Sequence, residues 1–381
     1  MGNNNRIFYG SQIAQLKPAT SGIKFGFWYQ PQGLQSVGYN TSVSTEQAFQ
    51  LGAIDIYSIS ENVPEVEVTL NKVVDGSCPL YLMAMGGKSG IAGANVTNFD
   101  DPEELKLKGF GGLAYNTVDF RLGIYKDTNS TVEGNTTDYI LCTPTYLSSL
   151  NYTFPVDGNA TEAITLVGNT KYLKANGSAE VSATMTAATI DKTAKKLARR
   201  HYIDVNNSIL PTGYGGAWKS GGLPTGVDVN LYLQNITISA NLGRDQINEL
   251  GQLAPYYRYA TFPVEVTTEF EIIGQVGDYV SANDFLFSSG CAVNYQNLND
   301  FPIKLKICGS GVGNEANNYD YSVSANNYLE FYLGSGNKLT SVSYAGGDTG
   351  GGNVTITYGF RNYNDFYMKA AGNYNGVAIV S

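Results

Sequence analysis

The sequence is poor in the residues that build most catalytic and metal sites. It has one histidine and four cysteines among 381 residues, and only 15% of its residues are charged. The single histidine, His201, excludes sites that need several imidazoles and has no serine or cysteine placed beside it as a nucleophile. The cysteines form no C-x-x-C pair, which favours buried thiols over a zinc site or a disulfide scaffold. We therefore expect no metal, no cofactor and no enzymatic activity.

Long apolar runs and positive charge are scarce as well. No segment is apolar over enough residues to span a bilayer, and the opening MGNNNRIFYG lacks the apolar centre of a signal peptide. We therefore expect no membrane contact. The net charge of −9 disfavours a protein that holds nucleic acid by its phosphates, although contact with DNA as non-specific cargo stays open.

Glycine and tyrosine are abundant, with 44 and 28 residues, and runs of Asn, Thr and Ser lie between them. This composition is typical of many short strands joined by turns. The predicted fold class is mainly β.

Four segments recur in the same order in the two halves of the chain. A tandem duplication explains four collinear matches better than chance does. The matched pairs are GIKFGFWYQ from Gly22 with GVDVNLYLQ from Gly226, TEQAFQLG ending at Gly52 with RDQINELG ending at Gly251, PEVEVTLNKV from Pro64 with FPVEVTTEFEI from Phe262, and LSSLNY from Leu147 with LTSVSY from Leu339.

The duplication predicts two related β-domains, residues 21–210 and 211–381, after an N-terminal arm of residues 1–20. TEQAFQLG and RDQINELG each predict a two-turn helix between strands, with a polar start and a glycine at the C-cap. Residues 186–205 predict a further helix that links or bridges the domains, with Ile190, Ala194 and Leu197 on one face.

Two charged clusters have ordinary explanations beside functional ones. DDPEEL, from Asp100 to Leu105, has the acids of a calcium site but also the N-cap, proline and first-turn acids of a helix start, which we favour. The basic residues of 186–205 would suit nucleic acid or membrane, but a solvated face or a contact with an acidic neighbouring subunit fits the net charge better.

Acidic residues alternate with apolar ones in two matched strands. Glu65 and Glu67 face away from Val66 and Val68, and the same parity separates an acidic from an apolar side in the second copy, where the acids are Glu265, Glu269 and Glu271. A glycosidase needs two carboxylates facing each other across a sugar, and that enzyme class stays a weak alternative. A regular acidic face indicates a surface instead, and a solvated sheet face explains it as well as a special role does.

The stretch SYAGGDTGGGNVTITYGF, from Ser343 to Phe360, raises the question of a phosphate-binding loop. Such a loop precedes a helix, whereas both flanks here alternate as strands do, so the sequence predicts a hairpin. The matching TFPVDG of the first copy lacks the glycine run, which favours a local contact role in the second copy. The candidate interface loop consists of Gly346, Gly347, Asp348, Gly350, Gly351 and Gly352.

Several of these segments resemble tail tube proteins of tailed bacteriophages. The run from Tyr232 to Ile272 resembles their strand, short helix, strand element, and Leu51 to Gly76 resembles the same class. NDFPIKLKICG from Asn299 and the segment from Gly336 to Phe360 are similar to phage virion structural proteins. The resemblance covers about half of the chain.

The resemblance implies two tandem β-sandwich or barrel domains of the tail-tube type, whose sheets join edge to edge in rings that stack into a tube. It implies self-association, as three chains in a pseudo-six-fold ring or as a hexamer with the related domain outside. It also implies contact with other tail proteins and a place in the virion tail after synthesis in the bacterial cytoplasm. DNA would pass through the channel. Because carboxylates repel phosphates, we expect Glu65, Glu67, Glu265, Glu269 and Glu271 to line this channel or to lie near it. The alternative is another virion β-protein that decorates the capsid or binds the host or its carbohydrate.

Overall fold

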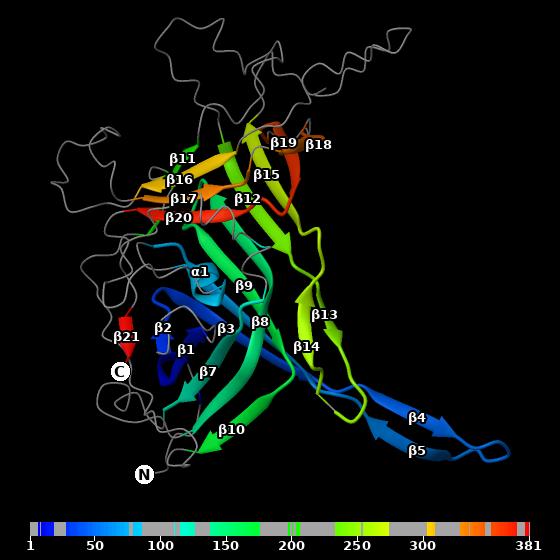
Figure 1. The fold of residues 1–381 in the computed structure, drawn as a ribbon. Helices are drawn as coiled ribbons and strands as arrows, with labels where there is room; N and C mark the ends of the chain where they lie inside the picture. Colours follow the sequence, from blue (N-terminus) through cyan, green and yellow to red (C-terminus); the bar gives the residue numbers. More distant parts are fainter. Residues whose placement is uncertain are drawn as a thin grey trace, which may run out of the picture.

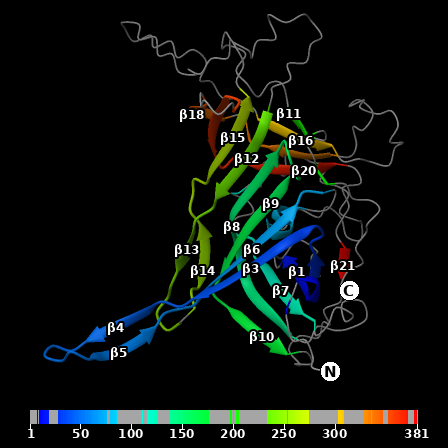
Figure 2. The same ribbon diagram turned by 180° about the vertical axis from the view of Figure 1, so that it is seen from behind.

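The computed structural model describes residues 7, 9–18, 28–75, 79–85, 110, 115–125, 138–175, 197–198, 200, 203–205, 233–252, 254–273, 303–308, 328–334, 336–346, 352–371 and 378–380. Over these residues the chain is built from antiparallel strands with one short α-helix, as the composition predicts (Figures 1 and 2).

The elements, in chain order, are η1 (Tyr9–Ser11), β1 (Gln12–Pro18), β2 (Trp28–Gln30), β3 (Leu34–Ser42), β4 (Thr45–Phe49), β5 (Ile56–Glu61), β6 (Glu65–Val73), α1 (Leu80–Met85), β7 (Val118–Ile124), β8 (Asp138–Pro155), β9 (Thr161–Gly168), β10 (Lys171–Ala175), β11 (Ile203–Val205), β12 (Leu233–Asn241), β13 (Arg244–Ile247), β14 (Tyr257–Ala260), β15 (Glu265–Ile273), β16 (Lys304–Cys308), β17 (Tyr328–Tyr332), β18 (Lys338–Ala345), β19 (Thr355–Tyr363), β20 (Tyr367–Ala371) and β21 (Ala378–Val380).

Eight strands form a continuous antiparallel run in the order β3-β6-β9-β8-β12-β15-β19-β18. We call β3, β6, β9 and the C-terminal part of β8 the first half-sheet, and β12, β15, β19 and β18 the second half-sheet. The order of pairing is the same in both half-sheets: the first strand in the chain pairs with the second, the second with the fourth, and the fourth with the third. The junction between them is the pairing of β8 with β12, from Ser149 opposite Asn241 to Pro155 opposite Asn235.

The two half-sheets also have their irregularities in matching places. The first two strands of each half-sheet pair with a register shift near the start of the first strand, and the last two pair with a shift after the leucine of the LSSLNY and LTSVSY segments. The shifts lie between Leu34 and Ser36, Leu233 and Asn235, Leu147 and Ser149, and Leu339 and Ser341.

Shorter strands repeat a second order of pairing. The N-terminal part of β8 pairs with β7 and β10, and β7 pairs with β1, while β17 pairs with β16 and β20, and β16 pairs with β11. The 18-residue strand β8 belongs both to the first short series and to the eight-strand run. In the second series these two positions are taken by separate strands, β17 and β18. The strands β2 and β21 extend the first series, so a segment near each end of the chain shares one sheet edge.

The four-stranded sheet β11-β16-β17-β20 packs against the apolar side of the junction, so both half-sheets share one core. Tyr152 and Phe154 on β8 meet the edge of Phe331 on β17, with ring centroids 4.8 and 5.5 Å apart. Tyr152 is fully buried, and its partner in the junction, Ile238, is fully buried too. Burial of these side chains ties the two half-sheets together through apolar contact as well as backbone pairing.

The helix α1 is buried on every side, and a carboxylate holds its first turn. Glu162 on β9 accepts hydrogen bonds from the backbone N–H groups of Leu80 and Tyr81 at 2.8 Å and from the Tyr152 hydroxyl at 2.5 Å. Burial raises the pKa of Glu162, while Lys72 and these three donors act to lower it. The carboxylate thus satisfies donors that the helix start leaves free.

The two predicted helices are wrong. TEQAFQLG contains β4, and RDQINELG contains β13, and each strand pairs with the next one as a hairpin. The glycines do take the positive φ expected of a C-cap, 85° at Gly52 and 91° at Gly251, but they do so in hairpin turns. A glycine with positive φ serves both structures, so this signal does not separate them.

The structure shifts two of the predicted segment matches and confirms the predicted hairpin at the glycine stretch. The pairings match Leu34 with Leu233, so β3 and not β2 corresponds to β12, and VEVT is two residues out of register between β6 and β15. The glycine stretch does join two strands, because Ala345 of β18 lies opposite Thr355 of β19. Asp100–Leu105 and most of the helix predicted at 186–205 lie outside the described residues, and 203–205 form β11.

Glu162 gives a test of the core. Glu162→Gln should lower the free energy of unfolding by about 1 to 3 kcal/mol, because the amide nitrogen would face a buried N–H donor and leave it unpaired. The control is Glu67→Gln, whose carboxylate is exposed on the opposite side of the sheet and should change stability by less than about 0.5 kcal/mol. Urea unfolding followed by circular dichroism measures both, and equal losses would contradict the assigned role.

Candidate functional site

One face of the eight-strand run is mostly polar from edge to edge. Strand pairing places every second residue of each strand on the same side, and the intervening residues form the buried core. This face, which we call the polar face, carries Glu65, Glu67, Thr69 and Asn71 of β6, Thr165 of β9, Asn151 and Thr153 of β8, Thr237 and Ser239 of β12, Glu265, Thr267, Glu269 and Glu271 of β15, Thr357 of β19, and Ser341 and Ser343 of β18.

The predicted parity of the acidic strands is confirmed. Val66, Val68 and Leu70 are fully buried, and Glu65 and Glu67 on the other side are exposed. In β15 the alternate apolar residues are buried, Glu269 is exposed, and Glu265 and Glu271 are half-buried. Strand pairing also brings both acidic strands to one face of one sheet, which the sequence could not establish. No ion pair joins Glu67, Glu269 or Glu271 to another residue that the structure describes.

The hairpin β13–β14, which we call the second hairpin, lies across the first half-sheet and is held there by two arginines. The Arg258 guanidinium donates to Glu65 at 3.2 Å through both terminal nitrogens and to the Asn169 amide oxygen at 2.8 Å. Arg244 donates from Nε to the Leu147 carbonyl at 2.7 Å. Burial lowers the pKa of Arg244 to about 10, which still leaves it charged at neutral pH.

Aromatic rings complete this contact. Tyr257 on β14 meets Tyr146 edge to face at 6.2 Å and stacks on Tyr115 at 6.1 Å, and Arg244 lies 5.5 Å from the Tyr146 ring. Because Arg258 is only 3% exposed, its charge needs the partners that β6 and Asn169 supply. The second hairpin is therefore a fixed part of the body.

The hairpin β4–β5, which we call the first hairpin, occupies the same place in the chain order but projects away from the body (Figures 1 and 2). Every residue of β4 and β5 is exposed. Its surface is unusually apolar for an exposed hairpin, because it carries Phe49, Leu51, Ile54, Ile56, Tyr57 and Ile59. Apolar side chains gathered in this way mark a contact surface. The apolar residues alternate in IDIYSIS, which is a strand signal that the predicted helix at TEQAFQLG did not take into account.

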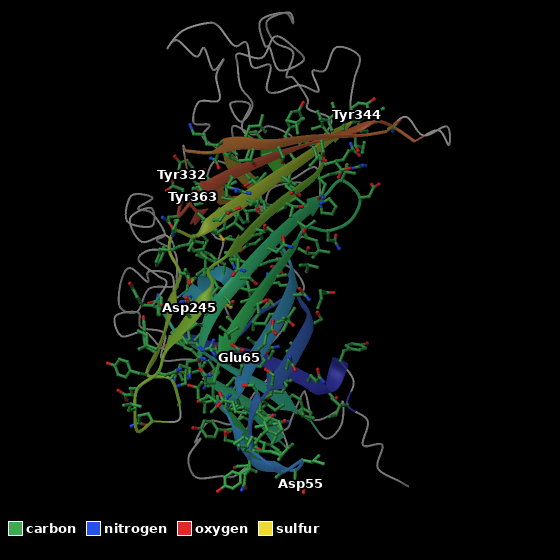
Figure 3. The ribbon with its side chains drawn as sticks, turned by 90° about the vertical axis from the view of Figure 1, so that its right-hand side faces the viewer. Asp55, Glu65, Asp245, Tyr332, Tyr344 and Tyr363 are labelled. Atoms are coloured by element: carbon green, nitrogen blue, oxygen red, sulfur yellow. The ribbon has the colours of Figure 1, made fainter. Side chains whose placement is uncertain are left out.

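The two ends of the eight-strand run are open edges. In the described chain β3 pairs only with β6, and β18 pairs only with β19. Tyr344 on β18 is 52% exposed although it lies on the same side of the sheet as the buried Ile356 (Figure 3). An open edge offers unpaired backbone groups to another strand.

The glycine loop lies beside one of these edges. Gly346 follows β18 directly, and at a φ of 151° a side chain there would meet Val354 at 2.8 Å, so the turn requires glycine at this position. Gly352 is exposed, and Gly347, Asp348, Gly350 and Gly351 lie outside the described residues. The contact role of this loop stays a prediction.

Over the part of the chain that the structure describes, no three His, Cys, Asp or Glu side chains gather as a metal site would need. No helix in the same described residues has the length and apolarity needed to cross a membrane.

No protein-family model and no curated protein matches the sequence. Among solved structures, the fold is similar to the tube-terminating cap of the anti-feeding prophage over 46% of this chain and 95% of that one, at 10% identity and a TM-score of 0.30. It is similar to the SPP1 tail tube over 45% and 80%, at 12% identity and 0.28. A chain of the anti-feeding prophage baseplate overlaps 45% and 97%, at 6% identity and 0.27.

These likenesses concern the fold over part of the chain.

Proposed function

We propose that this chain is a virion structural protein that assembles head to tail into rings, which stack into a tail tube for genome delivery. The observation that carries the proposal is the junction between β8 and β12. It joins the last strand of one half-sheet to the first strand of a half-sheet with the same pairing order. The free edges, β3 and β18, are the counterparts of those two strands, so a second copy can continue the sheet in the same way.

The junction predicts the register between chains. Matching by strand order and register shifts places Ser343 of one chain where Asn151 lies, and Asn40 of the next where Ser239 lies, so these two would be opposite each other. Tyr344 would then lie opposite Tyr39, as the buried Tyr152 lies opposite Ile238. The exposed side chain of Tyr344 gains a buried position in this arrangement.

The same pattern supports an internal duplication of a tube domain and a ring of three chains. Both half-sheets lie in one continuous sheet, which does not suit a hexamer in which the second domain decorates the outside. Three chains would supply six half-sheets around a pseudo-six-fold axis. Closure of a head-to-tail contact gives a ring of fixed size, and rings stacked with other tail proteins would form the tube.

We place the polar face toward the channel, because α1 and the four-stranded sheet cover the other side. DNA that slides through a channel must not bind its wall, and lysines or arginines would bind it by releasing counterions. All five predicted acids lie on this face, but Glu65 is paired with Arg258 and Glu265 with Arg361. Glu67, Glu269 and Glu271 would therefore be the ones that repel the phosphates.

Assembly is the direct test of the proposed ring. Purified chain at high concentration should form rings or tubes visible by negative-stain electron microscopy, and native mass spectrometry of the rings should give the mass of three chains. A chain that stays monomeric at every concentration contradicts the proposal, and a ring with the mass of six contradicts the duplicated arrangement.

Disulfide cross-linking tests the register. A single chain that carries both Asn40→Cys and Ser343→Cys should form disulfide-linked oligomers on oxidation, because directly opposite residues lie within bonding distance. The control chain carries Asn40→Cys and Tyr344→Cys, whose side chains would point to opposite faces and should not link. Non-reducing gels read out both, and linkage of the control alone would refute the register.

A charge reversal tests the channel face. Tubes of one chain that carries Glu67→Lys, Glu269→Lys and Glu271→Lys together should retain linear DNA in a filter assay at low salt. The DNA should be released as the salt concentration rises, because lysines bind phosphates by displacing their counterions and salt reverses that displacement. Unchanged tubes should retain none. The control places lysines on exposed loop residues outside the polar face, at Asp157 and Asp365. DNA retention by the control but not by the face variant would contradict the placement.

A further inference from the structure

The two hairpins occupy matching places in the chain but meet different surroundings. The second hairpin follows β12 in the chain and lies across the first half-sheet, to which β12 is joined by its pairing with β8. The first hairpin follows β3, which is an open edge, so the single chain has no half-sheet on which it can lie in the same way. In the proposed ring that position is filled by the second half-sheet of the next copy.

The second half-sheet has positions equivalent to those that the second hairpin contacts on the first half-sheet. We call these two sets of positions the first seat, on the first half-sheet, and the second seat, on the second half-sheet. The second hairpin contacts Glu65, Asn169 and the Leu147 carbonyl, and strand pairing matches these positions with Glu265, Tyr363 and Leu339. Tyr363 is 52% exposed, and the Glu265 side chain is 42% exposed. In Figure 3, Tyr363 lies above Glu65, on the second half-sheet.

The charges at the two seats are balanced in different ways. Cross-strand pairing matches Arg258 of the second hairpin with Ile59 of the first, so the first hairpin brings no guanidinium to this place. On the second half-sheet Glu265 already has a cation, because Arg361 Nε lies 2.8 Å from its carboxylate. The position that matches Arg361 on the first half-sheet is Val167.

The carboxylate is therefore neutralised once at each seat. At the first seat the hairpin supplies the arginine and the sheet supplies a valine. At the second seat the sheet supplies the arginine and the hairpin supplies an isoleucine that is 56% exposed in the single chain. A hairpin with an arginine at this place would put two cations together, whereas an isoleucine fits beside the existing Arg361–Glu265 ion pair and an exposed tyrosine ring.

We propose that the first hairpin of each chain lies across the second half-sheet of the neighbouring copy, with Ile59 beside Tyr363 and the Arg361–Glu265 pair. This inference rests on the proposed ring and assigns the hairpin its partner, a second copy of this chain. Contact along the hairpin would remove Ile59, and with it part of the exposed apolar surface of β5, from water.

Exchanging the two residues between the seats tests the inference. Ile59→Arg alone should raise the chain concentration needed for half-maximal ring formation by about tenfold or more, because two guanidinium groups meet and the isoleucine contact is lost. Arg361→Val alone should also weaken rings, because Glu265 is left without a cation beneath an apolar hairpin. The chain with both changes reproduces the Arg258, Glu65 and Val167 arrangement and should recover to within about threefold of the unchanged chain.

The control is Ser60→Arg, which adds the same charge on the other side of β5, at the position matched with Tyr259. Mass photometry over a dilution series measures ring formation, and thermal unfolding of the monomer checks that each chain is folded. Equal effects of Ile59→Arg and Ser60→Arg, or no recovery in the double variant, overturn the inference. If rings cross-link through Asn40→Cys and Ser343→Cys but form equally well with Ile59→Arg, the proposed ring is supported and only this contact is rejected. If the chain never forms rings, both the ring and this contact are rejected.

Discussion

The backbone pairing of β8 with β12 is the constraint on which the rest of the structure depends. It makes one sheet out of two half-sheets, and it places Tyr152 and Ile238 in a single core that the four-stranded sheet covers. It also sets the second hairpin over the first half-sheet, where Arg258 reaches Glu65. Because the same junction leaves its own two counterparts, β3 and β18, as open edges, it carries within the chain the pattern by which chains would join.

Local alternation is sufficient to predict β6 and β15 as strands and the side of the sheet on which Glu65 and Glu269 lie, because period-two patterns survive in any β arrangement. Other features depend on contacts distant in the chain. The helix α1 has no polar side and so gives no helical periodicity, and Glu162, which holds it, lies on a strand that follows much later. Gly52 and Gly251 signalled a left-handed residue correctly, but that signal is common to helix ends and hairpin turns.

The candidate surfaces were only partly accessible from sequence for the same reason. The acidic residues could be assigned to one side of each strand, yet only pairing across the junction brings β6 and β15 to one face. Arg258 and Ile59 had no recognisable motif, since their meaning comes from being matched positions on two hairpins. The two matched glutamates differ in the source of their cation: Arg258 of the second hairpin pairs with Glu65, whereas Arg361 of the second half-sheet pairs with Glu265.

Joining two half-sheets in one polypeptide has a consequence for assembly at low concentration. In the proposed ring half of the junctions are intramolecular, so dilution does not separate them, and only the other half require encounters between molecules. A closed ring of three long chains therefore persists to lower concentrations than one of six short chains with junctions of equal strength. The covalent connection between β8 and β12 would thus favour completed rings over fragments early in synthesis, when few copies of the chain are present.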